Sequence, residues 1–582
     1  MQKSGKFLAG IVAVFTLFAA ESARAESTVP SDLQNQPFYG VMVSESITSY
    51  TSGSHVHALN WPDQITFKGG GQWVCKNFDD PNCQTKDLID GTIVLSPCSK
   101  TTEPVCIDSL SIGRDGEKLS PATLDFEAVS QKIPASPISG VPAGGSVSLW
   151  KSSGVPNAFG SNDYLVVVAM TYRKNKGTDK AALTGFTANV VPSQVRTGNT
   201  YYAAESFTAN SPDGTPNIGF GWRGSRIHDE DSTKCEITTD GYCFIREDFS
   251  PNTKVSINLR LNNSLTGWLF GRLKTPTISV NKISDSINQL TVEALPVVVP
   301  ILVGGVLKSD LSKNPKIEND LKKEGSDRYN QVVGRGGFDG GLRNGINEVG
   351  LYKIFEDTLK VYSGNDSKFK KFTRWTFSSS GGPRAGSAFG STCFADKTKV
   401  IGIVTTNSPL YESGPPGFWN DSLNYFVAGP HFDADGKTLF LGVYDLNMRS
   451  ETARCFYGFS SAPLKAVVSV TSADGTSQDV QTEALSEKDG WLHLGAYNFH
   501  FSQPTISIKL SQEKPIAPTP AATPTSTPST PAATTPAPKA SKSSAPANPN
   551  KSKTIIITCV KGKTTKKVVG ANPTCPAGYK KK

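Results

Sequence analysis

The sequence has no apolar run after Ala25 that is long enough to cross a membrane as a helix. The strongest later run, Leu295–Leu307, is short and contains Pro296 and Pro300, so it favours a buried strand or an inter-domain segment. Charged residues are only 19% of the chain, but 37% hydrophobic and 9% aromatic residues exclude a fully disordered protein. The 53 Gly and 38 Pro argue against a long helical bundle. A loop-rich β protein fits this composition.

Acidic residues are missing from one end of the chain. Residues 551–582 contain nine lysines and no Asp or Glu, so this segment accounts for the formal net charge of +9. A protein that binds nucleic acid usually spreads its positive charge over a folded face. We therefore expect no nucleic-acid partner.

The N-terminus has the three parts of a secretory signal. Lys3 and Lys6 precede the apolar run 7–20, and Ala23-Arg24-Ala25 supplies small residues for cleavage. We expect residues 1–25 to be a signal peptide removed after Ala25. The mature protein would then be secreted, extracellular or associated with the cell wall, with no transmembrane segment.

The ten cysteines favour disulfide bonds, because an even number of thiols in an exported protein is usually paired. Three pairs have the same short spacing, which suits the two arms of a hairpin, and two further pairs follow from position. Pairing of Cys75 with Cys98 and of Cys83 with Cys106 remains an alternative. Zinc sites use closer cysteine pairs, so no metal is predicted. The expected bonds are Cys75–Cys83, Cys98–Cys106, Cys235–Cys243, Cys393–Cys455 and Cys559–Cys575.

Short β-branched or aromatic runs between turn residues predict a mainly β fold with two β-sandwich-like units. Asp-Gly dipeptides, which suit tight hairpins, separate many of these runs. The clearest strands expected are Tyr164–Met170, Lys254–Leu261, Val400–Thr405, Leu439–Tyr444 and Ala466–Val470.

The expected order of domains follows from these runs and from changes in composition. An N-terminal β-rich domain covers residues 26–300 and a second covers 371–513. Between them, residues 301–370 form a mixed connecting region with short helices. Asn314–Gly325 has a helix start and stop, whereas Leu351–Tyr362 fits a helix but ends in a stretch that also fits a strand.

Residues 514–553 are rich in Pro, Thr, Ala and Ser, which cannot bury a core. We expect a disordered linker that acts as a spacer. Its Ser and Thr residues leave O-glycosylation open.

The last segment, 554–582, predicts a small disulfide hairpin with many lysines. Its sequences I-T-C-V-K-G-K and C-P-A-G-Y-K resemble a lysine-rich C-terminal module of uncharacterised secreted actinobacterial proteins. The resemblance implies export and retention at the envelope, without a chemistry. The partner that positive charge would attract is an anionic cell-envelope polymer or glycan. A solubilising or export-related tail is the alternative. The lysines expected to bind are Lys561, Lys563, Lys566, Lys567, Lys580, Lys581 and Lys582.

No catalytic residue, cofactor or metal ligand is predicted. Ser378–Pro383 is similar to the surroundings of the nucleophile in trypsin-like proteases, but Ser379 replaces the expected Asp and no matching His segment precedes it. His55 and His57 alternate on one expected strand, which is weak support for a metal site. Tryptophans could stack on sugars, although in β sandwiches they are usually core residues. They are Trp73, Trp150, Trp222, Trp268, Trp375, Trp419 and Trp491.

The sequence thus favours a secreted, cell-envelope-associated, non-enzymatic β protein with a surface binding, adhesion or structural role. The alternative is an extracellular hydrolase acting on polysaccharide, because a spacer and a small terminal module also tether such enzymes. Its catalytic carboxylates would have to be chosen by their separation in space, which the sequence does not give.

Overall fold

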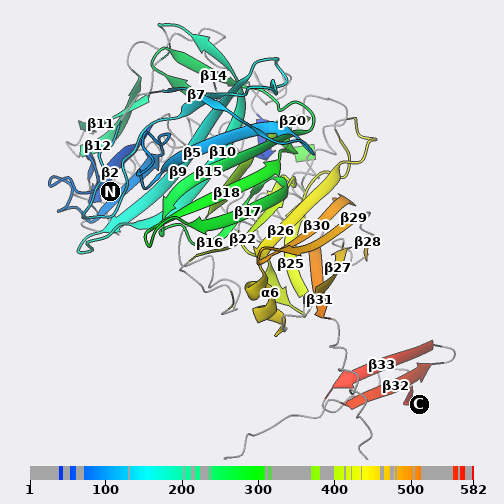
Figure 1. Cartoon of the computed structure of the whole chain (residues 1–582). Helices are drawn as coiled ribbons and strands as arrows, with labels where there is room; N and C mark the ends of the chain where they lie inside the picture. Colours follow the sequence, from blue (N-terminus) through cyan, green and yellow to red (C-terminus); the bar gives the residue numbers. More distant parts are fainter. Residues whose placement is uncertain are drawn as a thin grey trace, which may run out of the picture. The chain divides into compact units, whose positions relative to one another are not determined.

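The chain is mainly β and forms several sheets in the computed structural model (Figure 1). One α-helix, α6 (Ser450–Tyr457), is assigned among the described residues. The chain divides into two compact units, residues 1–515 and 516–582. The structure describes residues 38–43, 53–60, 71–128, 132–199, 201, 204–210, 216–222, 235, 237–307, 312–313, 315, 369–379, 393, 399–411, 414–420, 422–433, 435–458, 464–471, 477–478, 482–501, 505–512, 555–561, 564–570 and 580–581.

A sheet of 15 strands runs through the first unit. Its strands pair antiparallel except for the parallel pair β16 and β22. Its main path is β29 (Thr482–Lys488), β30 (Trp491–His500), β26 (Leu441–Arg449), β22 (Val400–Thr406), β16 (Gly267–Arg272), β21 (Thr376–Ser379), β10 (Ala182–Thr197), β9 (Asp163–Asn175), β4 (Leu88–Val94), β2 (His55–Asn60) and β3 (Gly71–Val74). Branches are formed by β13 (Ile237–Thr239) with β14 (Tyr242–Arg246), and by β7 (Thr123–Glu127) with β8 (Ser148–Lys151).

Smaller sheets complete this unit. The five-stranded sheet has the order β17 (Lys274–Lys282), β18 (Ile287–Leu295), β15 (Thr253–Asn262), β5 (Cys106–Arg114) and β6 (Ser120–Pro121). The six-stranded sheet contains β23 (Leu410–Tyr411), β25 (Ser422–Ala428), β31 (Thr505–Gln512), β27 (Leu464–Thr471) and β28 (Ser477–Gln478), with β24 (Gly417–Trp419) paired to β25. Two more sheets are β1 (Phe38–Val43) with β19 (Val297–Leu307) and β20 (Phe369–Arg374), and β11 (Ala204–Asn210) with β12 (Pro216–Trp222).

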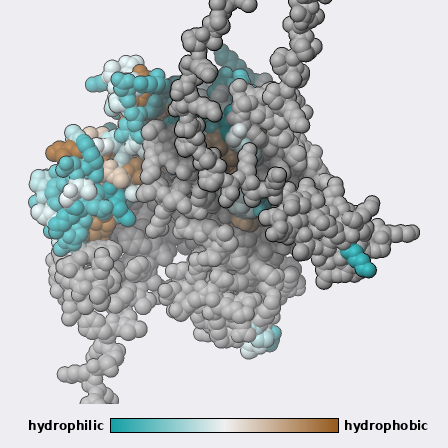
Figure 2. All heavy atoms as spheres, turned by 90° about the horizontal axis from the view of Figure 1, so that it is seen from below, coloured by the Kyte–Doolittle hydropathy of each residue, from teal (hydrophilic) through white to brown (hydrophobic). Residues whose placement is uncertain are grey.

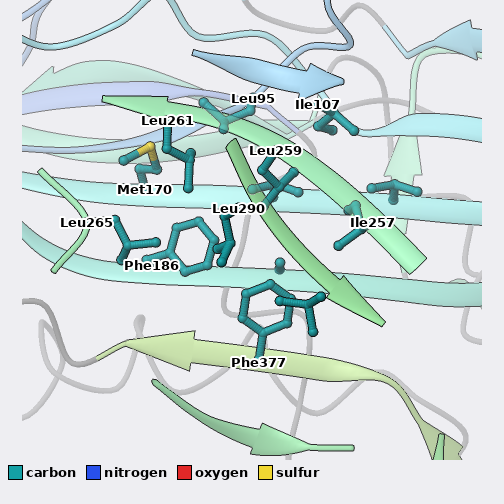
Figure 3. Packing of buried hydrophobic residues seen from close by; sticks show 14 of the residues in the cluster. Leu95, Ile107, Met170, Phe186, Ile257, Leu259, Leu261, Leu265, Leu290 and Phe377 are labelled. Atoms are coloured by element: carbon teal, nitrogen blue, oxygen red, sulfur yellow. The ribbon is translucent and has the colours of Figure 1, made fainter. Parts of the chain in front are cut away.

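The larger hydrophobic core lies between the five-stranded sheet and one face of the large sheet. In Figure 3, Leu261 of β15 lies close to Met170 of β9, and Leu265 lies beside Phe186 of β10. Alternate residues of a strand point to opposite faces, so the neighbouring residues of β9 face a second side. That side is also buried, which explains why this strand reads as a continuous apolar run.

A second core lies between β26, β30 and the six-stranded sheet. The two cores use opposite faces of the large sheet, because Ile403 belongs to the first core and its neighbour Val404 to the second. In β26, Tyr444 and Leu446 likewise belong to the second core. The other face of β26 is therefore the one that meets the five-stranded sheet.

Four disulfide bonds link cysteines in the pairs that the spacing indicates. Three join residues eight positions apart, and the fourth joins residues 62 positions apart. The fourth bond attaches Cys455 of helix α6 to Cys393. Arg454 of the same helix donates two hydrogen bonds, of 2.7 Å and 3.0 Å, to the carboxylate of Glu487 in β29. The expected bond Cys559–Cys575 falls partly outside the described residues. The observed bonds are Cys75–Cys83, Cys98–Cys106, Cys235–Cys243 and Cys393–Cys455.

The structure places the expected domains 26–300 and 371–513 in one compact unit that shares a sheet. The reason is the position of β16, which lies between β21 and β22 of the later segment. A boundary near residue 300 would cut these pairings, and sequence periodicity does not reveal them. In the connecting region 301–370, the described ends belong to strands β19 and β20.

The strands expected from sequence are confirmed, although β26 begins at Leu441 and runs on to Arg449, past the expected end. The signal peptide 1–25, the linker 514–553 and the helix candidate Leu351–Tyr362 lie outside the described residues, and of the candidate Asn314–Gly325 only Pro315 is described, in helical conformation. Within the described part of the chain, no helix has the length and hydrophobicity that membrane crossing requires.

The second unit contains a three-stranded sheet, ordered β33 (Thr564–Gly570), β32 (Ile555–Lys561) and β34 (Lys580–Lys581). Cys559 is the register partner of Lys566 on one side and Lys581 on the other. The expected hairpin is therefore present as β32 and β33, with a short third strand.

Candidate functional site

The strands β26 and β30 carry polar side chains on one face. Their register pairs Arg449 with Trp491, Asn447 with His493, and Asp445 with Gly495. Residues directly opposite one another in a sheet share a face, so these side chains form one row, which we call the polar face. The opposite face packs into the second core.

Asp445 is the buried centre of the polar face, with no exposed surface. Its Oδ1 lies 2.8 Å from Nε2 of His493 and also accepts the hydroxyl of Tyr497, while Oδ2 accepts the backbone N–H of Thr275 at 3.0 Å. An ionised carboxylate only accepts hydrogen bonds, so Nε2 of His493 carries the hydrogen. Three donors thus compensate the burial of this carboxylate.

Burial raises the pKa of Tyr497, and the negative charge of Asp445 raises it further. The phenol therefore stays protonated and acts as a donor. The side chain of His493 is 21% exposed, so this ring connects the buried carboxylate to the surface.

Strand β17 crosses the polar face and is held there by backbone contacts. Asn447 donates its side-chain amide to the carbonyl of Pro276. Thr275 has φ of 49°, which is rare for a β-branched residue, and the register of β17 on β18 shifts between Lys274 and Thr277. The hydrogen bond to Asp445 fixes this irregularity.

A half-enclosed cavity of about 300 Å³ opens where β15, β17 and β18 meet β22 and β26. Its apolar side includes Leu261, Leu265 and Leu290, all buried. Its polar side carries amides and charged groups from both sheets. This volume lies at the lower end of the range of small-molecule sites, about 300–1,000 Å³. We call it the arginine pocket, after Arg449.

Arg449 is held in place within the arginine pocket by two contacts. Its Nε donates to the carbonyl of Val400 at 2.8 Å, and its guanidinium carbon lies 4.9 Å from the centre of the Trp491 ring. Among the described residues, no acidic side chain forms an ion pair with this guanidinium. Its two terminal nitrogens form a planar fork that matches a carboxylate or phosphate.

Amides form the opposite rim of the arginine pocket. Asn288 donates to Oδ1 of Asn263 at 2.7 Å, and Asn263 donates to the carbonyl of Asp285 at 2.9 Å. These bonds orient both amides and leave one oxygen of Asn288 facing solvent or a ligand. Linked amides of this kind suit the hydroxyl groups of a polyol.

Two lysines at the edge of the arginine pocket are neutralised by acids. Lys282 lies 2.7 Å from Asp285, and Lys399 lies beside Glu451. Both ion pairs are well exposed, so they contribute little to stability. The pocket therefore combines one positioned guanidinium with amides and an apolar side.

His55 and His57 lie half-buried on one side of β2, with their rings parallel and 6.1 Å apart. His57 is the register partner of Asp90, which accepts two hydrogen bonds of 2.8 Å from Arg173. Burial, together with the nearby His57, lowers the pKa of His55 from 6.5 to about 4, although a hydrogen bond with the backbone of Gly53 acts in the opposite direction. Over the described ranges, no group of three metal-ligating side chains comes together.

Ser378 lies within the large sheet, and three of the seven candidate tryptophans are buried. Ser378 lies on the inner strand β21, where its hydroxyl is 3.0 Å from that of Thr187, and 380–383 lie outside the described residues. Trp150, Trp268 and Trp375 are buried. Trp419 is 39% exposed and stacks on Phe426 at 5.7 Å, while Trp73 and Trp491 are half-buried. The side chain of Trp222 lies outside the described residues.

The expected envelope-binding lysines are described only in part. The backbone positions of Lys561, Lys566, Lys567, Lys580 and Lys581 belong to the three-stranded sheet of the second unit, and Lys563 and Lys582 lie outside the described residues. Figure 2 shows one face of the molecule. Where its residues are described, that face is mostly hydrophilic, with hydrophobic side chains in small groups.

No family model, curated protein or solved structure matches this chain.

Sequence reasoning missed Arg449, Asp445 and His493. A signal was present, because Asp445-Leu-Asn447-Met-Arg449 and Trp491-Leu-His493-Leu both alternate polar or aromatic with apolar residues, as strands with two different faces do. The pairing that joins these rows into one face is a long-range contact, which alternation alone does not specify.

Proposed function

We propose that this chain is a secreted, cell-envelope-associated, non-enzymatic β protein that binds a component of the cell surface. The observation that carries the proposal is the arginine pocket, where Arg449 is positioned by Val400 and Trp491 beside oriented amides. This arrangement supports recognition, since it presents donors and an apolar surface to a ligand. The four disulfide bonds agree with an oxidising compartment.

The lysine-rich second unit would add a second attachment. Its nine lysines per 32 residues attract anionic envelope polymers in a manner that depends on salt. The linker would let the two units reach different points of the envelope, and two linked sites bind more tightly than either alone.

The test is co-sedimentation of the mature chain with purified cell envelopes across a salt series. A version ending at Glu513 keeps all strands of the first unit, because β31 ends at Gln512. We expect both forms to sediment, with the shorter form binding more weakly and with less dependence on salt. If the mature chain stays in the supernatant at low salt, the proposed function is wrong.

An extracellular hydrolase acting on polysaccharide is the second candidate. One observation favours it: His493 is oriented by the buried Asp445, as a general base would be. Incubation of the mature chain with envelopes should then release glycan fragments, and His493→Asn should abolish the release. If the unmodified chain releases fragments and His493→Asn does not, catalysis rather than binding is the main function.

A further inference from the structure

We infer that the arginine pocket binds a sugar unit that carries one anionic group, a carboxylate or a phosphate. Arg449 binds the anionic group, the amides of Asn263 and Asn288 bind hydroxyl groups, and the apolar side receives the carbon face of the ring. The inference rests on the proposed function, because it names the ligand class of that surface-binding site.

The position of Arg449 specifies an anion. Its Nε donates a hydrogen bond to the carbonyl of Val400, and the guanidinium lies over the ring of Trp491. The guanidinium is therefore fixed before a ligand arrives. A fixed fork loses little side-chain entropy on binding, and it forms two parallel hydrogen bonds with a carboxylate or phosphate. A neutral sugar would leave this cation without a counter-charge.

The charges around the pocket strengthen this selectivity. Lys282 and Lys399 are each paired with an acid, so their charges are locally balanced. Among the described residues that line the pocket, Arg449 differs from these two lysines, because no acidic side chain forms an ion pair with it. An anionic group therefore has one position where it meets an uncompensated charge.

The opposite rim and the apolar side specify a sugar. Asn263 and Asn288 are hydrogen-bonded to each other, which aligns donors and acceptors at fixed positions. Leu261, Leu265 and Leu290 supply the apolar side, which suits the C–H groups of a sugar ring. A bare inorganic anion would use Arg449 but neither of these features. With about 300 Å³, the cavity accommodates a single small ring.

The experiment is isothermal titration calorimetry of the mature full-length chain with four probes: glucuronate, glucose 6-phosphate, glucose and inorganic phosphate. We expect glucuronate or glucose 6-phosphate to bind at least about tenfold more tightly than glucose and than inorganic phosphate. The preference between the first two identifies a carboxylate or a phosphate as the natural group.

Variants connect binding to the pocket. Arg449→Gln should weaken binding of the anionic sugar about tenfold or more, and Asn263→Ala about threefold or more. Asn263 is exposed, so its replacement leaves the fold intact. The matched control is Lys176→Gln, which removes a positive charge from the turn between β9 and β10, outside the pocket, and should change binding less than about twofold. Thermal unfolding of every variant confirms that it is folded.

Several outcomes overturn the inference. They are equal binding of glucose and glucuronate, inorganic phosphate binding as tightly as glucose 6-phosphate, no heat with any probe, or wild-type affinity in both Arg449→Gln and Asn263→Ala. The co-sedimentation result is independent. If the chain binds envelopes but not anionic sugars, the proposed function stands and the ligand class inferred here is wrong. If the chain binds anionic sugars but not envelopes, the pocket has the inferred ligand class and the proposed function is wrong.

Discussion

Asp445 and His493 form a hydrogen bond of 2.8 Å that links a fully buried carboxylate to a partly exposed imidazole. The same carboxylate receives the hydroxyl of Tyr497 and the backbone of Thr275. The network therefore fastens β26 and β30 of the large sheet to β17 of the five-stranded sheet. Strands β26 and β17 also line the arginine pocket, through Arg449 and Lys282.

We predict that Asp445→Asn lowers the free energy of unfolding by about 2–4 kcal/mol, because an amide group cannot accept from all three donors and adds a donor of its own. Tyr497→Phe removes one donor and should cost about 1.5–3 kcal/mol. Urea unfolding of the two variants and of the double variant measures both effects and their coupling. Costs that simply add would mean that the two side chains act independently.

The half-buried His55 predicts a loss of stability in acid. The folded state lowers the pKa of His55 from 6.5 to about 4, so between these values the unfolded chain binds more protons than the folded one. Stability then falls as the pH falls from about 6.5 to about 4, by about 1–3 kcal/mol, and is independent of His55 above that range. The groups that act on the His55 ring are His57 and the backbone of Gly53, while Asp90 and Arg173 act on His57.

His55→Gln should flatten this pH dependence, because Gln does not titrate. The measurement is the urea midpoint at pH 7.5, 6, 5 and 4.5 for both proteins. Burial also lowers the pKa of His57, so a second replacement, His57→Gln, should flatten the curve further. Parallel curves for the wild type and His55→Gln would show that this ring is not the source of acid sensitivity.

The fold could be predicted from sequence where the pattern is local. Cysteines eight residues apart can close only a turn, so their disulfide bonds follow from spacing. The strands that contain Tyr164 and Lys254 are stretches of strand-forming residues with turn residues at both ends. The insertion of β16 between β21 and β22 could not be predicted, because it depends on which strand edge is free after folding. The two expected β units are joined for this reason.

The polar residues of β26 were not identified from the sequence, for a specific reason. The expected strand ended at Tyr444 and left out Asp445, Asn447 and Arg449. They are strand residues whose polar face is covered by β17 and therefore needs its own hydrogen-bond partners. Burial of a polar face against a second sheet is a tertiary property, so periodicity alone does not reveal it.

The bond Cys393–Cys455 should stabilise the fold more than any local bond. It closes a separation of 62 residues, compared with eight for Cys98–Cys106. Loop-closure entropy then gives a cost of about 4 kcal/mol for Cys393→Ser with Cys455→Ser and about 2.5 kcal/mol for Cys98→Ser with Cys106→Ser. Urea unfolding of the two double variants tests this order. The reverse order would show that local strain or residual structure outweighs chain entropy.

Two neighbouring threonines of β22 provide the sharpest test of hydrogen bonding in the interior. Thr405 and Thr406 both have no exposed surface. The hydroxyl of Thr406 accepts the N–H of Ser408 at 3.1 Å, whereas that of Thr405 has no hydrogen-bond partner among the described residues.

Valine has nearly the shape of threonine without the hydroxyl. Thr406→Val should therefore lower the free energy of unfolding by about 1 kcal/mol, because it removes a hydrogen bond. Thr405→Val should raise it by up to about 1 kcal/mol, because it removes an uncompensated polar group beside Asp445. Since both changes add the same atoms to the same strand, a difference in sign between the two urea midpoints isolates the hydrogen bond. Equal losses in both variants would mean that Thr405 is also satisfied, by a buried water.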